Sequence, residues 1–256
     1  PATVPQGGFD QAAIPGLNSP FVPSVNFDFF PYSGILRPVR LCGVPRTHIG
    51  DLRVEFAEPA ADGSGLVRAR AFTSTGSGTI RWTLEPSGKS ACSESGEPVE
   101  IRIPDPALWD VGQPNLYSLR AELMDGETVA DSCSKTFGIR SVRVEGDRLL
   151  LNGRPVYLRG FGRHEDMPVT GRGFSEAFHV RDMELLRWCG GNSFRTAHYP
   201  HAEEFLDLAD RLGILIIGES PAVSMIPSVA GAETLDLHIR AVREMIRRDA
   251  HHPSVI

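Results

Sequence analysis

The sequence contains few cysteines, and they form no metal-binding or redox pattern. Only Cys42, Cys92, Cys133 and Cys189 are present among 256 residues, and no two of them make a C-x-x-C pair. Zinc sites and redox-active dithiols depend on closely spaced cysteines, so both are disfavoured. We expect free thiols and, from their lack of pattern, an intracellular protein, with a bridge between Cys92 and Cys133 as the alternative.

Long apolar runs and an excess of basic charge are also lacking. No apolar run approaches the roughly 20 residues that span a bilayer, and the residues after Pro1 do not resemble a secretion signal. The 26 Lys and Arg are outnumbered by 32 Asp and Glu, for a net charge of -6, which offers no basic face to a phosphate backbone. We therefore expect neither a membrane nor a nucleic acid as partner.

Motifs for cofactors and metals are missing too. The Gly-Phe-Gly stretch at 160–162 lacks the third glycine of a dinucleotide-binding loop. His238, His251 and His252 invite a metal interpretation, but adjacent histidines at a helix end rarely converge on one ion. We expect no cofactor and no metal.

Alternating apolar and polar residues dominate the chain from residue 46 to residue 138. Before it, eight of the twenty prolines lie within residues 1–45, which excludes continuous helix there. The alternation, with every second residue apolar, occupies 52–56, 67–71, 80–84, 99–103 and 119–123. Short strands of this kind predict an immunoglobulin-like β-sandwich. Trp82 and Trp109 are expected in its core or between domains, with a sugar-stacking pair as the alternative.

From residue 139 onward the periodicity changes to that of alternating strands and helices. After a hairpin at 142–151, strands are predicted at 156–158, 193–194, 214–217 and 254–256, and helices at 177–189, 203–212 and 234–249. The first helix is expected to turn Val180, Met183, Leu186 and Trp188 to one side. A closed (β/α)₈ barrel needs eight units and about 250 residues, so we expect only the first half of one.

Charged residues follow three of the predicted barrel strands. They are Arg163, His164, Glu165 and Asp166 after the first strand, Arg195 and His198 after the second, and Glu219 after the third. The C-terminal ends of barrel strands converge on one face, where the active sites of such barrels lie. The sequence therefore predicts an active site formed by these loops.

Several stretches together resemble glycoside hydrolase family 2, and most closely its β-glucuronidases. They are the Arg-Thr-Ala-His-Tyr-Pro at 195–200, the Arg-His-Glu-Asp at 163–166, the His-Pro-Ser-Val-Ile at 252–256, the Leu-Trp-Asp at 108–110 with Pro-Asn-Leu-Tyr at 114–117, and residues 27–39. The resemblance implies a multidomain β plus α/β protein. Residues 1–45 would end a jelly-roll sugar-binding domain, 46–138 would form the sandwich, and 139–256 would begin a TIM barrel.

The resemblance also implies retaining hydrolysis of terminal β-D-glucuronides. Both catalytic glutamates are expected beyond Ile256, so the chain is expected to be an incomplete and inactive fragment, with a homo-oligomer open for the complete protein. Arg195 would donate hydrogen bonds to the nucleophile, and His164 and His198 would contact sugar hydroxyls or the surroundings of the nucleophile. Asp166 would accept hydroxyl hydrogen bonds. Glu219 follows a glycine where the family usually has an Asp-Glu pair.

Other interpretations stay open for the site and for the activity. Arg195 suits an ion pair between loops, each histidine a hydrogen-bonded loop residue, and Asp166 a solvated acid. Within the family, β-galactosidase or another β-glycosidase is the alternative, although β-galactosidases tend to carry histidine where Asp166 stands. Outside the enzymes, the alternative is a non-catalytic carbohydrate-binding protein.

Overall fold

The computed structural model describes residues 34–223 and 231–256. The resemblance to jelly-roll strands at 27–39 therefore falls mostly outside the described residues. Residues 34–48 contain neither helix nor strand and lead to the first sheet as an extended segment. None of the helices in the described ranges is long and apolar enough to cross a bilayer.

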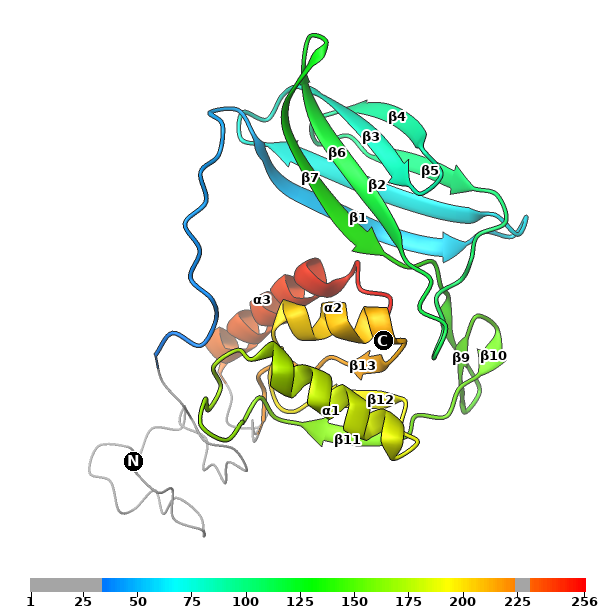
Figure 1. The fold of residues 1–256 in the computed structure, drawn as a ribbon, viewed down its shortest axis with the longest axis vertical. Helices are drawn as coiled ribbons and strands as arrows, with labels where there is room; N and C mark the ends of the chain where they lie inside the picture. Colours follow the sequence, from blue (N-terminus) through cyan, green and yellow to red (C-terminus); the bar gives the residue numbers. More distant parts are fainter. Residues whose placement is uncertain (1–33, 224–230) are drawn as a thin grey trace.

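Seven antiparallel strands form the two sheets of the sandwich (Figure 1). One sheet has the order β1-β2-β5 and the other the order β4-β3-β6-β7. The strands are β1 (Ile49–Pro59), β2 (Gly65–Thr73), β3 (Thr79–Glu85), β4 (Lys89–Glu94), β5 (Val99–Ile103), β6 (Tyr117–Asp125) and β7 (Thr128–Phe137). All five predicted strands are present. Their inward residues form a single core between the sheets, which includes Trp82.

The sequence pattern missed β4 and β7, and it placed one residue on the wrong face. Both missed strands lie at the edges of their sheet and are mostly polar, so they lack an apolar alternation. Phe56 was expected beside Leu52 and Val54 in the core. A shift in register between Val54 and Phe56 turns Phe56 outward, opposite Arg68, and Ala57 takes its place against the core.

The position of the two missed strands excludes a disulfide within the sandwich. Cys92 lies on β4 and Cys133 on β7, with β3 and β6 between them. Three strand spacings amount to about 14 Å, whereas the Cα atoms of a disulfide lie within about 7 Å. The alternative bridge between Cys92 and Cys133 is therefore wrong.

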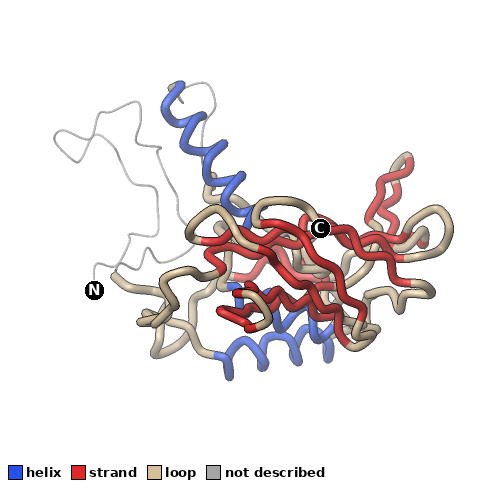
Figure 2. The backbone as a smooth tube through the Cα atoms, turned by 90° about the horizontal axis from the view of Figure 1, so that it is seen from above, coloured by secondary structure: helices blue, strands red, loops and turns tan. Residues whose placement is uncertain are grey.

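The second half of the chain contains a hairpin and then a parallel sheet (Figure 1). Some helices lie beside the strands, and one helix extends away from them (Figure 2). The hairpin sheet consists of β8 (Val142–Glu145), β9 (Arg148–Leu151) and β10 (Arg154–Pro155). The parallel sheet consists of β11 (Gly160–Arg163), β12 (Ser193–Thr196) and β13 (Leu215–Ile217), and the helices are α1 (Glu176–Trp188), α2 (Glu203–Leu212) and α3 (Ala232–Asp249). Val255 forms a parallel bridge with Ile216, where a fourth strand was predicted. The described residues form part of a barrel wall and no closed barrel.

The first barrel strand lies after the predicted one because two backbones approach closely at a glycine. The apolar residues 156–158 form no strand, and Tyr157 is 82% exposed. Gly160 instead pairs with Ser193 on β12. A Cβ at residue 160 would lie 1.7 Å from the Ser193 carbonyl oxygen, so only glycine fits there.

The buried face of α1 also differs from the prediction. Val180 is 40% exposed and Trp188 is 84% exposed, whereas His179 is buried with Met183 and Leu186. These three residues follow the spacing of one helix face. His179 therefore occupies the buried position that the apolar pattern had assigned to its neighbour Val180.

His179 predicts a pH dependence of stability. Burial, followed by the charge of Arg163, lowers the pKa of His179 to about 4. Since an unfolded histidine titrates near 6.5, the unfolded chain binds a proton between these values that the folded chain does not. The free energy of unfolding therefore falls as the pH is lowered from 6.5 toward 4. His179→Leu should reduce that fall by roughly 2 kcal/mol, measured by urea denaturation at pH 7 and pH 4.5. Equal pH slopes for the two proteins would contradict the assignment.

A buried tryptophan joins the sandwich to the barrel segment. Trp109 is fully buried, and its indole Nε1 donates to the backbone oxygen of Asp210 at 2.8 Å. Nearby, Arg140 donates from Nε to the carbonyl of Pro253 at 2.6 Å and from Nη2 to that of Val255 at 2.5 Å. Both Trp82 and Trp109 are thus packing residues as predicted, and the alternative of a sugar-stacking pair is wrong.

Candidate active site at the strand ends

The predicted site residues occupy the C-terminal ends of three adjacent parallel strands. His164 and Asp166 follow β11, Arg195 lies on β12 with His198 after it, and Glu219 follows β13. Arg195 pairs in register with Gly162 on one side and Ile217 on the other. The sheet therefore brings side chains from distant parts of the chain to one edge.

Arg195, His198 and Glu219 form a connected group. One guanidinium nitrogen of Arg195 donates to Glu219 Oε2, and His198 Nδ1 lies 2.9 Å from Glu219 Oε1. The backbone N–H of Glu219 donates to Thr196 Oγ1 at 2.8 Å. The ion pair between barrel loops that was the alternative for Arg195 is therefore present, with Glu219 as the partner.

Gly162 leaves room for this arginine. A Cβ at residue 162 would lie 3.1 Å from Arg195 Nη2, closer than most side-chain contacts allow. The two glycines of β11 thus make room for different groups. Gly160 allows β11 to approach β12 closely, and Gly162 leaves space for the guanidinium group of Arg195.

His164 and Asp166 lie beside this group. The rings of His164 and His198 meet edge to face, with centroids 5.2 Å apart. Both His164 and Asp166 are half-buried. Burial raises the pKa of Tyr199, and the charge of Asp166 is among the smaller causes in the same direction, so this carboxylate lies near the loop after β12. The structure brings all five predicted residues to one region.

The sequence did not single out Tyr199 or Arg172 as part of this region. Arg172 stacks over the Tyr199 ring, with Cζ 3.7 Å from the centroid. Tyr199 is buried, and its hydroxyl accepts a hydrogen bond from the backbone N–H of Glu165. Tyr199 follows His198 directly, which was the one available signal, whereas nothing in the spacing pointed to Arg172.

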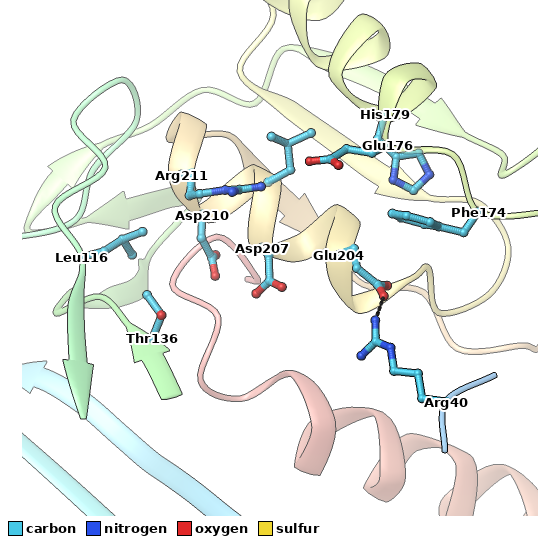
Figure 3. Close-up of a pocket in the computed structure, with 11 residues that line it drawn as sticks. Arg40, Leu116, Thr136, Phe174, Glu176, His179, Glu204, Asp207, Asp210 and Arg211 are labelled. Carbon is cyan, nitrogen blue, oxygen red and sulfur yellow. Dashed lines mark hydrogen bonds and ion pairs between the residues drawn. The ribbon is translucent and has the colours of Figure 1, made fainter. Parts of the chain in front are cut away.

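A separate cavity of about 400 Å³ is lined mainly by residues of α1 and α2, and by none of the five predicted site residues (Figure 3). Its lining includes four carboxylates from α1 and α2, and Arg40 from the extended segment donates to one of them, Glu204. Its wall includes Asp207 and Asp210, which together with His252 form a set of three metal-type donors. Asp210 already accepts from His252 Nδ1 at 2.6 Å and from the Ser254 N–H at 3.0 Å. Each oxygen of the Asp210 carboxylate therefore has a hydrogen-bond partner.

The chain matches two models of one enzyme family. Residues 47–140 match the model described as "Glycosyl hydrolases family 2", and residues 142–256 match "Glycosyl hydrolases family 2, TIM barrel domain". The two matches cover most of the chain.

Several proteins that are named β-glucuronidase, some of them with solved structures, are similar to this chain over most of its length. The β-glucuronidase of Paenibacillus borealis is 40% identical over 90% of this chain and 40% of its own length. That of Felis catus is 37% identical over 92% of this chain and 38% of its own length. The structure of Ruminococcus gnavus β-glucuronidase in complex with D-glucuronic acid superposes with a TM-score of 0.78 at 40% identity, over 90% of this chain and 39% of that one. The chain thus spans about two fifths of the length of these relatives, and it belongs to glycoside hydrolase family 2.

Proposed function

We propose that the full-length protein containing this chain is a retaining glycosidase that hydrolyses terminal β-D-glucuronides. The observation that carries this proposal is the gathering of Arg195, His198 and Glu219 beside His164 and Asp166 at the strand ends. Similar proteins named β-glucuronidase, one of them solved with D-glucuronic acid, support the choice of sugar. Retaining hydrolysis needs two carboxylates, and neither is assigned to a residue of this chain.

Within this proposal the five residues shape the sugar-binding subsite. Asp166 accepts hydrogen bonds from two hydroxyls, because a carboxylate offers acceptors in that geometry. His164 and His198, whose rings meet edge to face, contact the sugar. Arg195 donates hydrogen bonds to the nucleophile, which is not assigned to a residue of this chain, and Glu219 orients both Arg195 and His198.

The proposal also covers the domain boundaries, the substrate, the cellular location and the self-association of the protein. Residues 46–138 form the sandwich and 139–256 form the first part of the catalytic barrel, while the jelly-roll end expected for residues 1–45 lies mostly outside the described residues. A β-glucuronide is the substrate, and an intracellular location with self-association of the complete protein is proposed with it.

The substrate is tested with chromogenic glycosides. We expect the full-length protein to hydrolyse 4-nitrophenyl β-D-glucuronide with a kcat/KM at least about 100-fold above that for the matching β-D-galactoside, because a site built for a substrate group strongly rejects analogues that lack it. Proton NMR should show the β-anomer of glucuronic acid as the first product, as retention requires. A preference for the galactoside would replace the proposed substrate with that of the β-galactosidases.

The non-enzymatic alternative makes an opposite prediction. A carbohydrate-binding protein would bind sugar through residues 1–138, with no turnover and no change in affinity when Arg195 or Asp166 becomes alanine. Isothermal titration with glucuronic acid distinguishes the two, since the proposed enzyme loses sugar binding in Asp166→Ala.

A further inference from the structure

Residues 163–167 alternate between buried and half-buried as the chain leaves β11. Arg163, Glu165 and Met167 are buried, whereas His164 and Asp166 are half-buried. The two proposed sugar contacts therefore flank a carboxylate that faces away from the sugar subsite. At 2% exposure, Glu165 is among the most buried charged residues of the described chain, and a buried carboxylate needs partners.

Both carboxylate oxygens and the backbone N–H of Glu165 have hydrogen-bond partners. Its Oε1 accepts from the backbone N–H of Ala202 at 2.8 Å, and its Oε2 accepts from Arg37 Nη2 at 2.5 Å. Its backbone N–H donates to the hydroxyl of Tyr199 at 3.0 Å. These bonds join the loop after β11 to the loop after β12 at two points and to the extended segment at a third.

The bond to Ala202 explains how α2 begins without a capping side chain. Ala202 is the N-cap residue of α2, and its methyl group cannot accept a hydrogen bond. The Glu165 carboxylate accepts from this first turn instead and places negative charge at the positive end of the helix dipole. The start of α2, and with it the loop that carries His198, is thereby fixed to the residue between His164 and Asp166.

We propose that Glu165 is a positioning residue that sets the placement of His164 and Asp166 relative to His198, with Arg37 as its counter-charge. The inference rests on the proposed function, in which those three side chains bind the sugar. Glu165 itself faces α2 and touches no reacting atom. Because the carboxylate is buried and bonded at both oxygens, its loss removes the bonds to Ala202 and Arg37 together, while the bond from the Glu165 N–H to Tyr199 remains.

The kinetic test compares Glu165→Ala and Glu165→Gln with Glu204→Ala in the full-length protein. Glu204 is the matched control, because it lies in the same first turn of α2 and pairs with Arg40 of the same extended segment at 3.0 Å. Misplacing binding groups by about 1 Å can cost about 100-fold, so Glu165→Ala should lower kcat/KM about 100-fold, with a higher KM and a lower kcat. Glu165→Gln keeps an oxygen for Ala202 and should lose about tenfold, whereas Glu204→Ala should stay within about threefold.

A second measurement does not depend on turnover. Amide hydrogen exchange at residues 164–166 and 202 should be at least about tenfold faster in Glu165→Ala than in the wild type, and unchanged in Glu204→Ala. A wild type without glucuronidase activity would refute the proposed function, and exchange would still test whether Glu165 joins the loops. An active wild type with unchanged kinetics or exchange in Glu165→Ala, or equal losses in Glu165→Ala and Glu204→Ala, would refute the positioning role alone.

Discussion

Replacing Arg195 with alanine is expected to lower the kcat/KM of the full-length protein for 4-nitrophenyl β-D-glucuronide by about 1,000-fold. In the wild type one guanidinium nitrogen bonds Glu219 and lies 3.2 Å from His198 Nδ1. The substitution removes the positive charge that contacts both Glu219 and His198, and Glu219 loses its ion pair. The loss of one fixed donor at a reacting centre costs about 100- to 1,000-fold, and the disturbance of His198 adds to it.

Steady-state kinetics on folded variants tests this prediction. Arg187→Ala is the control, because Arg187 forms an exposed ion pair with Glu184 on α1 at 3.3 Å, and such pairs contribute little. Arg195→Lys should recover only a small part of the activity, since an ammonium group cannot reproduce the planar donor geometry. A loss below about tenfold in Arg195→Ala would remove Arg195 from the proposed site and leave it as an ion pair between loops.

Replacing Trp109 with alanine is expected to lower the free energy of unfolding by about 4 kcal/mol. The side chain is fully buried and packs with Leu151 and Leu215, which come from the hairpin and from β13. Truncation of a buried tryptophan costs about 3 to 5 kcal/mol through lost burial and the cavity left behind. It also leaves the backbone oxygen of Asp210 without the indole donor.

Trp188→Ala provides the matched control for this stability prediction. Trp188 is 84% exposed at the end of α1, so its truncation should change the free energy of unfolding by less than about 0.5 kcal/mol. Urea denaturation followed by circular dichroism measures both variants without relying on tryptophan fluorescence. A cost below about 1 kcal/mol for Trp109→Ala would show that the ring does not join the two parts.

The fold could be predicted where one local pattern determines the element. Alternating apolar residues predicted five sandwich strands, and Gly213 marked the end of α2 with its left-handed backbone. The pattern failed where contacts between residues far apart in the sequence determine whether a strand forms. The polar strands β4 and β7 depend on pairing with β3 and β6, and β11 depends on glycines that allow close approach to β12. A bulge in β1 likewise reversed Phe56 without a signal in its own neighbours.

The candidate site shows the same division. Residues that follow successive strands could be expected to meet, because parallel strands of one sheet end at one edge. The hydrogen bonds of Glu165 could not be expected from sequence spacing. This residue bonds Ala202, which lies 37 residues later in the chain, and Arg37, which lies 128 residues earlier. Apolar periodicity says nothing about such polar contacts, which become visible only when the loops are in place.

The position of Arg140 has a consequence for the order in which the molecule assembles. Its guanidinium binds carbonyls of Pro253 and Val255, the latter lying beside β13. Arg140 follows the last sandwich strand and precedes Pro253 by 113 residues. During synthesis on the ribosome, a folded sandwich therefore presents this cation before the residues that it binds have been made. This contact between the two parts can therefore form only after residues 253–255 have been made.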